Sequence, residues 1–296
     1  MKYRFKELIV TGLVYSVSKL PFSMLQCMGY LVGKIASVLP GRCKEVIAAN
    51  IDICFPNMDA KEKQTLAKKT LIESGKTLFE MPAFWLNSPK KIKPLIKKIY
   101  GEEEMLSALG EGHGMILVGP HLGAWEIMNF YMPSDYSVVT LYKPHKMQKL
   151  NQLICEARER FGHTMMPTNA SGVKALYKAL ENNKIIGILP DQDPGKGGGR
   201  FIDFFGIPTW TMTLITRLLQ KTKVSVFSVY VERLGIGKGF NIHLKKLDAS
   251  IYSEDEKVSL TTMNKAIEEC INHVPHQYQW CYKRFKTRPE GEKSIY

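Results

Sequence analysis

Short apolar runs alternate with helix-like stretches after residue 114, and this alternation limits the fold most strongly. The runs are typical of buried strands. They lie at residues 115–118, 137–141, 185–189 and 224–230. Helical patterns separate them at residues 124–131, 146–161 and 171–181. This order predicts an α/β fold with a central, mostly parallel sheet flanked by helices. Residues 240–244 are expected to pair at an edge of that sheet.

The segment after the strand at 115–118 carries the first candidate for chemistry. Gly119 and Pro120 separate this strand from His121. Proline cannot continue a strand's hydrogen bonding, and Gly123 permits a sharp turn. Ligands of open α/β sheets gather where strands end and helices begin. His121 is therefore expected in a functional site.

Glu126 lies five residues after His121. On one helix the two side chains point about 140° apart, so they meet only if His121 is in the loop and Glu126 in the next helical turn. A carboxylate on one imidazole nitrogen leaves the other free to accept a proton, which suits a general base acting on a hydroxyl group. The alternative is a glutamate that caps a helix beside a polar loop histidine.

The N-terminus is predominantly apolar. Residues 8–18 carry no charge, and residues 22–39 carry only Lys34. A spanning helix needs roughly 20 apolar residues, so the two halves fit one kinked span, two interfacial helices or a pair of soluble core helices. We expect residues 1–40 to be an N-terminal membrane-anchoring helical segment and residues 41–296 to be the catalytic domain.

Two smaller features accompany this segment. Basic residues precede it, which favours the cytoplasmic side for that end. They are Lys2, Arg4 and Lys6. Gly29 and Gly33 have the spacing of a helix-packing motif.

The chain is strongly basic, with 41 Lys and Arg against 28 Asp and Glu and a formal net charge of +13. Such a charge favours nucleic acid, anionic lipid headgroups or an acidic carrier protein, unless it is only a basic soluble surface. The apolar N-terminus and the absence of a nucleic-acid-binding motif argue against nucleic acid. The six cysteines form no C-x-x-C pair and are expected to be reduced thiols, and no metal site is predicted.

Several segments resemble the bacterial lipid A biosynthesis acyltransferases, the lauroyl and myristoyl transferase family. GPHLGAWEIMNF resembles the family's H-x4-E/D motif. Further similar blocks are Asn50 with Phe55-Pro56, Arg158 to Gly162, Asp191 to Gly195, Phe204 to Pro208, and Tyr278 to Lys286. The resemblance runs in order from about residue 8 to residue 288.

This resemblance implies a glycerophosphate-acyltransferase-like fold and transfer of a fatty acyl chain from acyl carrier protein to a hydroxyl of a lipid A precursor. It makes His121 the base and Glu126 its orienting partner, without a metal or redox cofactor. It places the enzyme on an anionic surface of the inner membrane, facing the cytoplasm. The alternatives are another lipid acceptor (a lysophospholipid, an amino-acid lipid or a glycolipid), acyl-CoA as donor, or a membrane-binding protein without catalysis.

The resemblance also suggests substrate-binding residues. They are Lys143, Arg158, Arg160, Asp191 and Asp193. Lys143 stands where many members have arginine, which removes a bidentate phosphate contact. Arg158 is a candidate for a phosphate or for the carrier, unless it pairs with Glu156 or Glu159 on its own helix. Asp191 either lines the site or holds a loop closed.

Overall fold

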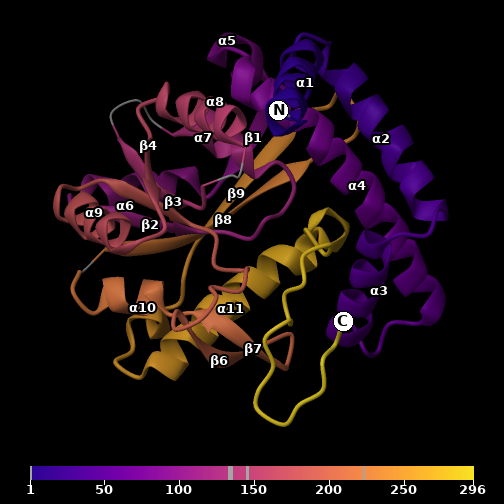
Figure 1. Ribbon diagram of the computed structural model, residues 1–296. Coiled ribbons are helices and arrows are strands. Elements are labelled where there is room, and N and C mark those ends of the chain that lie inside the picture. The colour runs from indigo at the N-terminus through magenta and orange to yellow at the C-terminus, as the bar shows by residue number, and fades with distance from the viewer. Residues whose placement is uncertain (1, 133–135, 145–146, 223) are drawn as a thin grey trace.

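The computed structural model describes residues 2–132, 136–144, 147–222 and 224–296, with side chains from residue 7 onward, so the side chains of Lys2, Arg4 and Lys6 lie outside it. Its centre is a seven-stranded sheet in the order β1-β9-β8-β2-β5-β3-β4 (Figure 1). The strands are β1 Ile96–Tyr100, β2 Met115–Val118, β3 Val138–Tyr142, β4 Thr164–Pro167, β5 Ile185–Ile188, β8 Ser225–Arg233 and β9 Phe240–Lys246. Every neighbouring pair is parallel except β8 with β9, which confirms the predicted α/β architecture.

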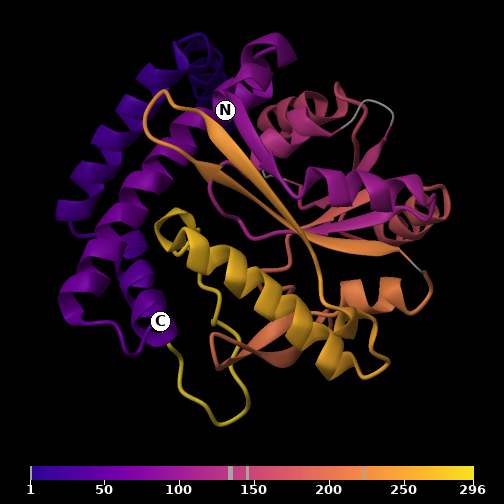
Figure 2. The same cartoon turned by 180° about the vertical axis from the view of Figure 1, so that it is seen from behind.

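Helices cover both faces of the sheet, and the central strands have apolar side chains on both sides to pack against them. In β2, Met115 and Leu117 pack in one cluster with helix α6, whereas Ile116 and Val118 pack in another with α9, α10 and α11. The helices are α6 Glu102–Gly110, α7 Met128–Tyr131, α8 Gln148–Glu159, α9 Ala170–Glu181, α10 Leu214–Leu219 and α11 Glu256–His273. Figure 2 shows α11 from the back of the molecule, next to the small hairpin of β6 Gly199–Phe204 and β7 Ile207–Met212.

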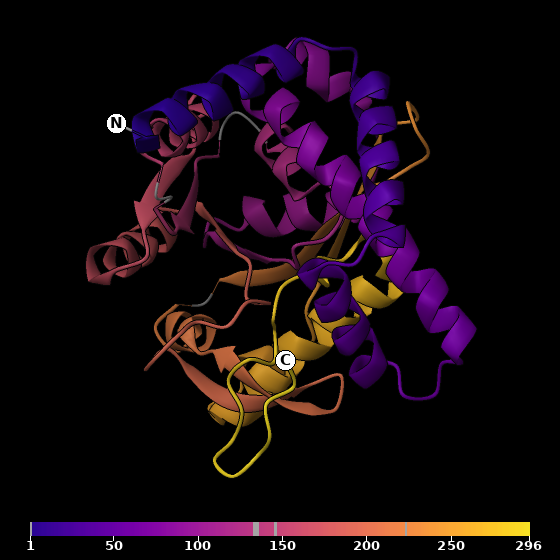
Figure 3. The same cartoon turned by 45° about the vertical axis from the view of Figure 1, so that its right-hand side comes forward.

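The N-terminal third is helical and packs beside the sheet (Figure 3). Its helices are α1 Lys2–Ser18, α2 Phe22–Val38, α3 Arg42–Cys54 and α4 Ala60–Leu86. Helix α2 lies so close to α4 that a Cβ atom on Gly29 would stand 2.5 Å from Cα of Lys76, and one on Gly33 would stand 2.4 Å from Cα of Ile72. The Gly29/Gly33 spacing is therefore a helix-packing motif, as predicted.

The apolar N-terminus does not form a long continuous helix. Among the described residues, no single helix combines the length and apolar character needed to cross a bilayer. Helices α2 and α3 meet the length and composition test only as a pair, and they are bent by 80° relative to each other.

Helix α4 begins at a capping box, in which Asp59 accepts a hydrogen bond from the backbone of Glu62. The lysine-rich residues 89–98 do not form one continuous helix. Helix α5 Pro89–Ile92 and the turn η1 Lys93–Leu95 are followed by strand β1, which pairs with β9. Ile96 and Ile99 are half-buried in this strand while the lysines between them are exposed, so tertiary pairing overrides the local helical preference.

Two predictions need correction. Strand β9 is not an edge strand, because it lies between β1 and β8. Residues 125–131 form the 3-10 turn η2 Trp125–Ile127 and the short α7 rather than one helix. The glycine-rich stretch after Asp193 leads at Gly199 into the hairpin of β6 and β7. The predicted helix at 146–161 is α8, although residue 146 lies outside the described residues.

The C-terminal segment, after η3 Ala249–Tyr252 and α11, crosses the molecule through η4 Pro275–Gln277 and ends near α3 (Figure 1). The side-chain amide of Asn50 on α3 donates to the backbone oxygens of Trp280 (2.7 Å) and Tyr282 (2.9 Å). These contacts fix the segment that passes beside His121.

Candidate active site

His121 lies in the loop that follows β2, and glycine shapes this loop. Gly123 has a φ of 60°, and a Cβ atom there would lie 1.8 Å from the backbone oxygen of Val231. The backbone nitrogens of Gly123 and Ala124 donate to the oxygens of Gln277 (3.0 Å) and Val231 (3.1 Å). Because only glycine fits, the loop bends tightly against β8 and carries His121 at the carboxyl end of the sheet.

A buried carboxylate holds the imidazole. Oδ1 of Asp191 lies 2.7 Å from Nδ1 of His121, and Oδ2 accepts a hydrogen bond of 2.8 Å from the backbone nitrogen of the same residue. Asp191 follows β5, the parallel neighbour of β2, so the two residues reach the same edge of the sheet. Burial by itself raises the pKa of Asp191. The attraction to His121 and these hydrogen bonds lower the pKa by a larger amount, so the net pKa is below the usual range.

The sequence-based assignment of Glu126 as the partner of the imidazole is therefore corrected: Asp191 takes this position. Glu126 lies in the turn η2 after the loop and is buried. It accepts hydrogen bonds from Nε of Arg158 at 3.2 Å and from Nδ2 of Asn129 at 2.8 Å. A second guanidinium nitrogen of Arg158 donates to the other carboxylate oxygen. Asp191 follows the neighbouring strand β5 and reaches His121. The carboxylate of Glu126 contacts Arg158 on α8 instead.

Arg158 comes from α8 and forms a two-contact ion pair with Glu126 rather than with Glu156 or Glu159 of its own helix. Burial lowers the pKa of Arg158, but the charge and hydrogen bonds of Glu126 raise it more. The guanidinium therefore stays charged. Its side chain keeps 24% of its surface exposed, so the cation remains accessible beside the loop.

The other imidazole nitrogen faces a polar and partly open side. Nε2 of His121 lies 3.5 Å from Nε2 of Gln192, which donates to Oε1 of Gln279 at 3.3 Å. The backbone nitrogen of Gln279 donates to the oxygen of His121 at 3.0 Å. The His121 side chain is 19% exposed. Sequence reasoning did not select the two glutamines, although both lie inside segments that resemble family blocks.

The remaining predicted binding residues are spread around this centre. Lys143 is exposed at the end of β3. Arg160 donates to the backbone oxygens of Asn87 (2.6 Å) and Phe84 (3.3 Å), so its guanidinium caps the end of α4. Asp193 has a fully buried carboxylate whose Oδ1 accepts from the backbone of Gly195 at 2.8 Å, while its Oδ2 has no hydrogen-bond partner among the described residues.

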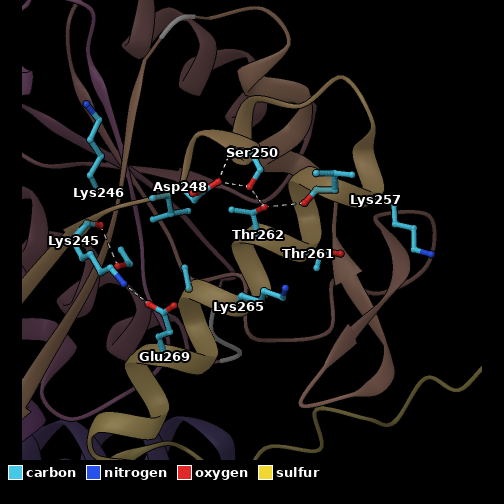
Figure 4. A pocket seen from close by; sticks show the side chains of 13 residues that line it. Lys245, Lys246, Asp248, Ser250, Lys257, Thr261, Thr262, Lys265 and Glu269 are labelled. Carbon is cyan, nitrogen blue, oxygen red and sulfur yellow. Dashed lines mark hydrogen bonds and ion pairs between the residues drawn. The ribbon is translucent and has the colours of Figure 1, made fainter.

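A separate cavity of about 710 Å³ lies between the end of β9 and α11 (Figure 4). Four lysines line it: Lys245, Lys246, Lys257 and Lys265. Lys245 pairs with Glu269 at 2.6 Å, and Asp248 accepts hydrogen bonds from the backbone and hydroxyl of Ser250. None of these residues belongs to the His121 cluster, so the cavity is a basic feature separate from the candidate site.

The fold and this geometry define a class of enzyme. A histidine at the carboxyl edge of a parallel sheet, with Nδ1 bonded to a buried carboxylate and Nε2 facing the side-chain amide of Gln192, has the geometry that suits a general base. Within the described residues no group of three or more His, Cys, Asp or Glu is arranged to hold a metal ion.

The chain belongs to the bacterial lipid A biosynthesis acyltransferase family, whose model matches residues 2–287, and it is an acyltransferase. It is 27% identical over 286 residues to a lipid A biosynthesis lauroyltransferase of Escherichia coli K12, covering 96% of this chain and 92% of that protein. It is 28% identical over 290 residues to a lipid A biosynthesis acyltransferase of Haemophilus influenzae, covering 95% and 90%. A lipid A biosynthesis myristoyltransferase of E. coli K12 is 23% identical over 266 residues, covering 90% and 82%.

Proposed function

We propose that this enzyme transfers a fatty acyl chain from acyl carrier protein to a hydroxyl group of a lipid A precursor, late in lipid A biosynthesis. The observation that carries the proposal is the His121–Asp191 pair, which engages Nδ1 and leaves Nε2 facing the side-chain amide of Gln192, in a side chain that is partly exposed. The names of the relatives support lipid A as the product, because they are lipid A lauroyl-, myristoyl- and palmitoleoyltransferases.

In the proposed reaction, Nε2 of His121 removes the proton of the acceptor hydroxyl while that oxygen attacks the thioester carbonyl of the donor. The new C–O ester bond forms as the C–S bond breaks, and the imidazolium returns the proton to the leaving thiolate. Asp191 fixes the tautomer that exposes Nε2 and stabilises the imidazolium, as an aspartate does in a catalytic triad. No serine or cysteine lies in residues 119–126, so a direct transfer suits this segment.

We assign Glu126 a different task from that of a partner to His121. Its carboxylate holds the Arg158 guanidinium by two contacts, next to the loop and partly exposed. An arginine fixed in this way is suited to a phosphate of the acceptor or to the oxygen of the reacting carbonyl. Lys143, exposed at the end of β3, adds positive charge for the same anionic acceptor.

The proposed location is the cytoplasmic face of the bacterial inner membrane, with α1 and α2 as the anchoring elements. Both helices carry large apolar residues of which 44–71% of the surface is exposed. These residues are Leu8, Ile9, Leu13, Leu31, Val32, Ile35 and Val38. Such a face suits insertion into the interfacial layer of a bilayer. The net charge of +13 favours the anionic headgroups beneath it, and also an acidic carrier protein.

The proposal is tested by supplying the purified full-length chain with two donors and two acceptors. Acyl carrier protein and coenzyme A, each loaded with the same labelled fatty acid, are combined with a lipid A precursor or a lysophospholipid, and the products are weighed by mass spectrometry. We expect acylated lipid A precursor from the carrier-protein donor, and no such product from His121→Ala. Transfer to the lysophospholipid alone would show that the acceptor is not a lipid A precursor. A fully active His121→Ala enzyme would show that His121 is not the base.

A further inference from the structure

A buried ion cluster lies directly behind the loop of His121. Its centre is Arg233, the last residue of β8, whose side chain is 1% exposed. The guanidinium donates to both carboxylate oxygens of Glu80, at 2.6–3.0 Å, and to Oε2 of Glu73 at 2.8 Å. Nζ of Lys76 bonds to Glu73 at 2.6 Å, so two cations and two anions are balanced inside the protein.

The same arginine contacts the loop. Its Nη2 donates to the backbone oxygen of Gly123 at 3.3 Å and to Oγ1 of Thr77 at 2.8 Å. Gln277 completes the connection: its side chain accepts from the backbone nitrogen of Arg233 at 2.8 Å and donates to the backbone oxygen of Arg233 at 2.7 Å. Its own backbone oxygen accepts from the nitrogen of Gly123 at 3.0 Å. Gly123 is thus held at both of its backbone polar groups.

An arginine at position 233 is informative, because stability by itself rarely explains a buried ion cluster. Apolar side chains of similar volume often stabilise a core equally well, since they avoid the desolvation of the charges. A planar guanidinium with five donors, however, reaches Glu73, Glu80 and Gly123 at fixed angles, which neither an apolar side chain nor a lysine does. Burial lowers the pKa of Arg233, but the two glutamates raise it more, so the group stays charged.

We propose that Arg233 is a positioning residue for the acyl transfer reaction: with Gln277, it fixes the bend at Gly123 and thereby sets the position of His121 against Asp191. This inference rests on the proposed role of His121 as the base. Arg233 acts through the backbone of the loop and contacts no reacting atom. Its loss should therefore slow the chemical step while leaving the binding of the two substrates intact.

The test compares Arg233→Lys with Thr77→Val in the full-length enzyme, using kcat and KM for both substrates. Arg233→Lys keeps the charge but loses the fork that reaches Gly123. Thr77→Val removes one hydrogen bond of the same cluster without touching the loop. We expect kcat of Arg233→Lys to fall about 10- to 100-fold with KM near the wild-type value, because small misplacements of a catalytic group are costly. Thr77→Val should keep its kcat even where its Tm is lower.

Gln277→Met serves as a second variant in case Arg233→Lys does not fold, and we expect the same selective fall in kcat. A wild-type kcat in either folded variant overturns the proposal, and so does a fall in Thr77→Val equal to that in Arg233→Lys. His121→Ala is measured in the same assay to separate the two claims. If that variant is inactive while Arg233→Lys is fully active, only the positioning role is wrong. An active His121→Ala rejects the proposed role of His121 as the base.

Discussion

At the scale of single residues, the proposed reaction centre depends on a carboxylate that forms two contacts with one histidine. Asp191 accepts from the backbone nitrogen of His121 and bonds to Nδ1 of its ring, so the orientation of the ring is fixed relative to the main chain. Both contacts use a charged acceptor, and such hydrogen bonds are the stronger kind. An amide in place of Asp191 can satisfy only one of the two contacts with its oxygen.

Asp191→Asn should therefore lower kcat by about 10²- to 10⁴-fold, as expected when an imidazole loses the carboxylate that fixes its tautomer. The matched control is Asp203→Asn on the exposed side of β6, which removes the same charge elsewhere and should keep wild-type activity. The measurement is steady-state transfer at saturating donor and acceptor. Equal activity of the two variants would show that Asp191 does not support His121.

The pair also predicts how stability depends on pH. Because the pKa of Asp191 is lower in the folded chain than in the unfolded one, its stabilising contribution is present above the ordinary carboxyl pKa and is lost as pH falls through the lowered value. The unfolding free energy of Asp191→Asn, measured by urea denaturation at several pH values, should not show the loss of stability that Asp191 contributes as pH falls. A variant that loses stability toward acid as steeply as the wild type would contradict the lowered pKa.

The sequence was sufficient to predict that His121 lies in a loop at the sheet edge, since proline and glycine follow a buried strand. It was not sufficient to pair the histidine with Asp191, which is 70 residues away. That contact requires β5 to lie beside β2, and the order of strands along the chain does not reveal this neighbourhood. The H-x4-E/D spacing suggests Glu126 as the partner of His121, but the ion pair with Arg158 determines where its carboxylate points.

At the scale of elements, prediction succeeded for strands rich in apolar residues and failed for strands with polar or charged residues among them. The buried strands β2, β5 and β8 are predominantly apolar, so their composition identified them. Strand β1 contains two lysines, and β6 and β7 contain charged and polar residues after a glycine-rich stretch. For these strands, pairing with a neighbour decides the structure rather than the local pattern.

Helix α2 offers a test at this scale, because one of its faces packs on α4 and the other is apolar and exposed. The double variant Leu31→Glu with Ile35→Glu should lose most of its co-sedimentation with phosphatidylglycerol vesicles, since charges oppose burial in the interface. Leu106→Glu on α6 is the control, as it adds a charge at another exposed leucine (41%). Vesicle binding of the double variant equal to that of the control would remove α2 as the anchoring element.

At the scale of the whole molecule, three distant parts of the chain meet at the loop of His121. The sheet supplies His121 and Asp191 at neighbouring strand ends, the C-terminal segment supplies Gln277 and Gln279, and α4 contacts the loop through the Arg233 cluster. The apolar exposed faces of α1 and α2 lie on the helical part that packs on α4 (Figure 3). The site and the proposed membrane contact therefore belong to one connected framework.

The central claim, that His121 is the base for acylation of a lipid A precursor, is tested most directly by the mass spectrum of lipid A. The spectrum is taken from a strain that lacks the gene and carries either the wild-type chain or His121→Ala. We expect the deletion to remove the mass of one fatty acyl chain, the wild-type chain to restore it, and His121→Ala to leave it missing. A lipid A mass that is unchanged by the deletion, or restored by His121→Ala, would contradict this account.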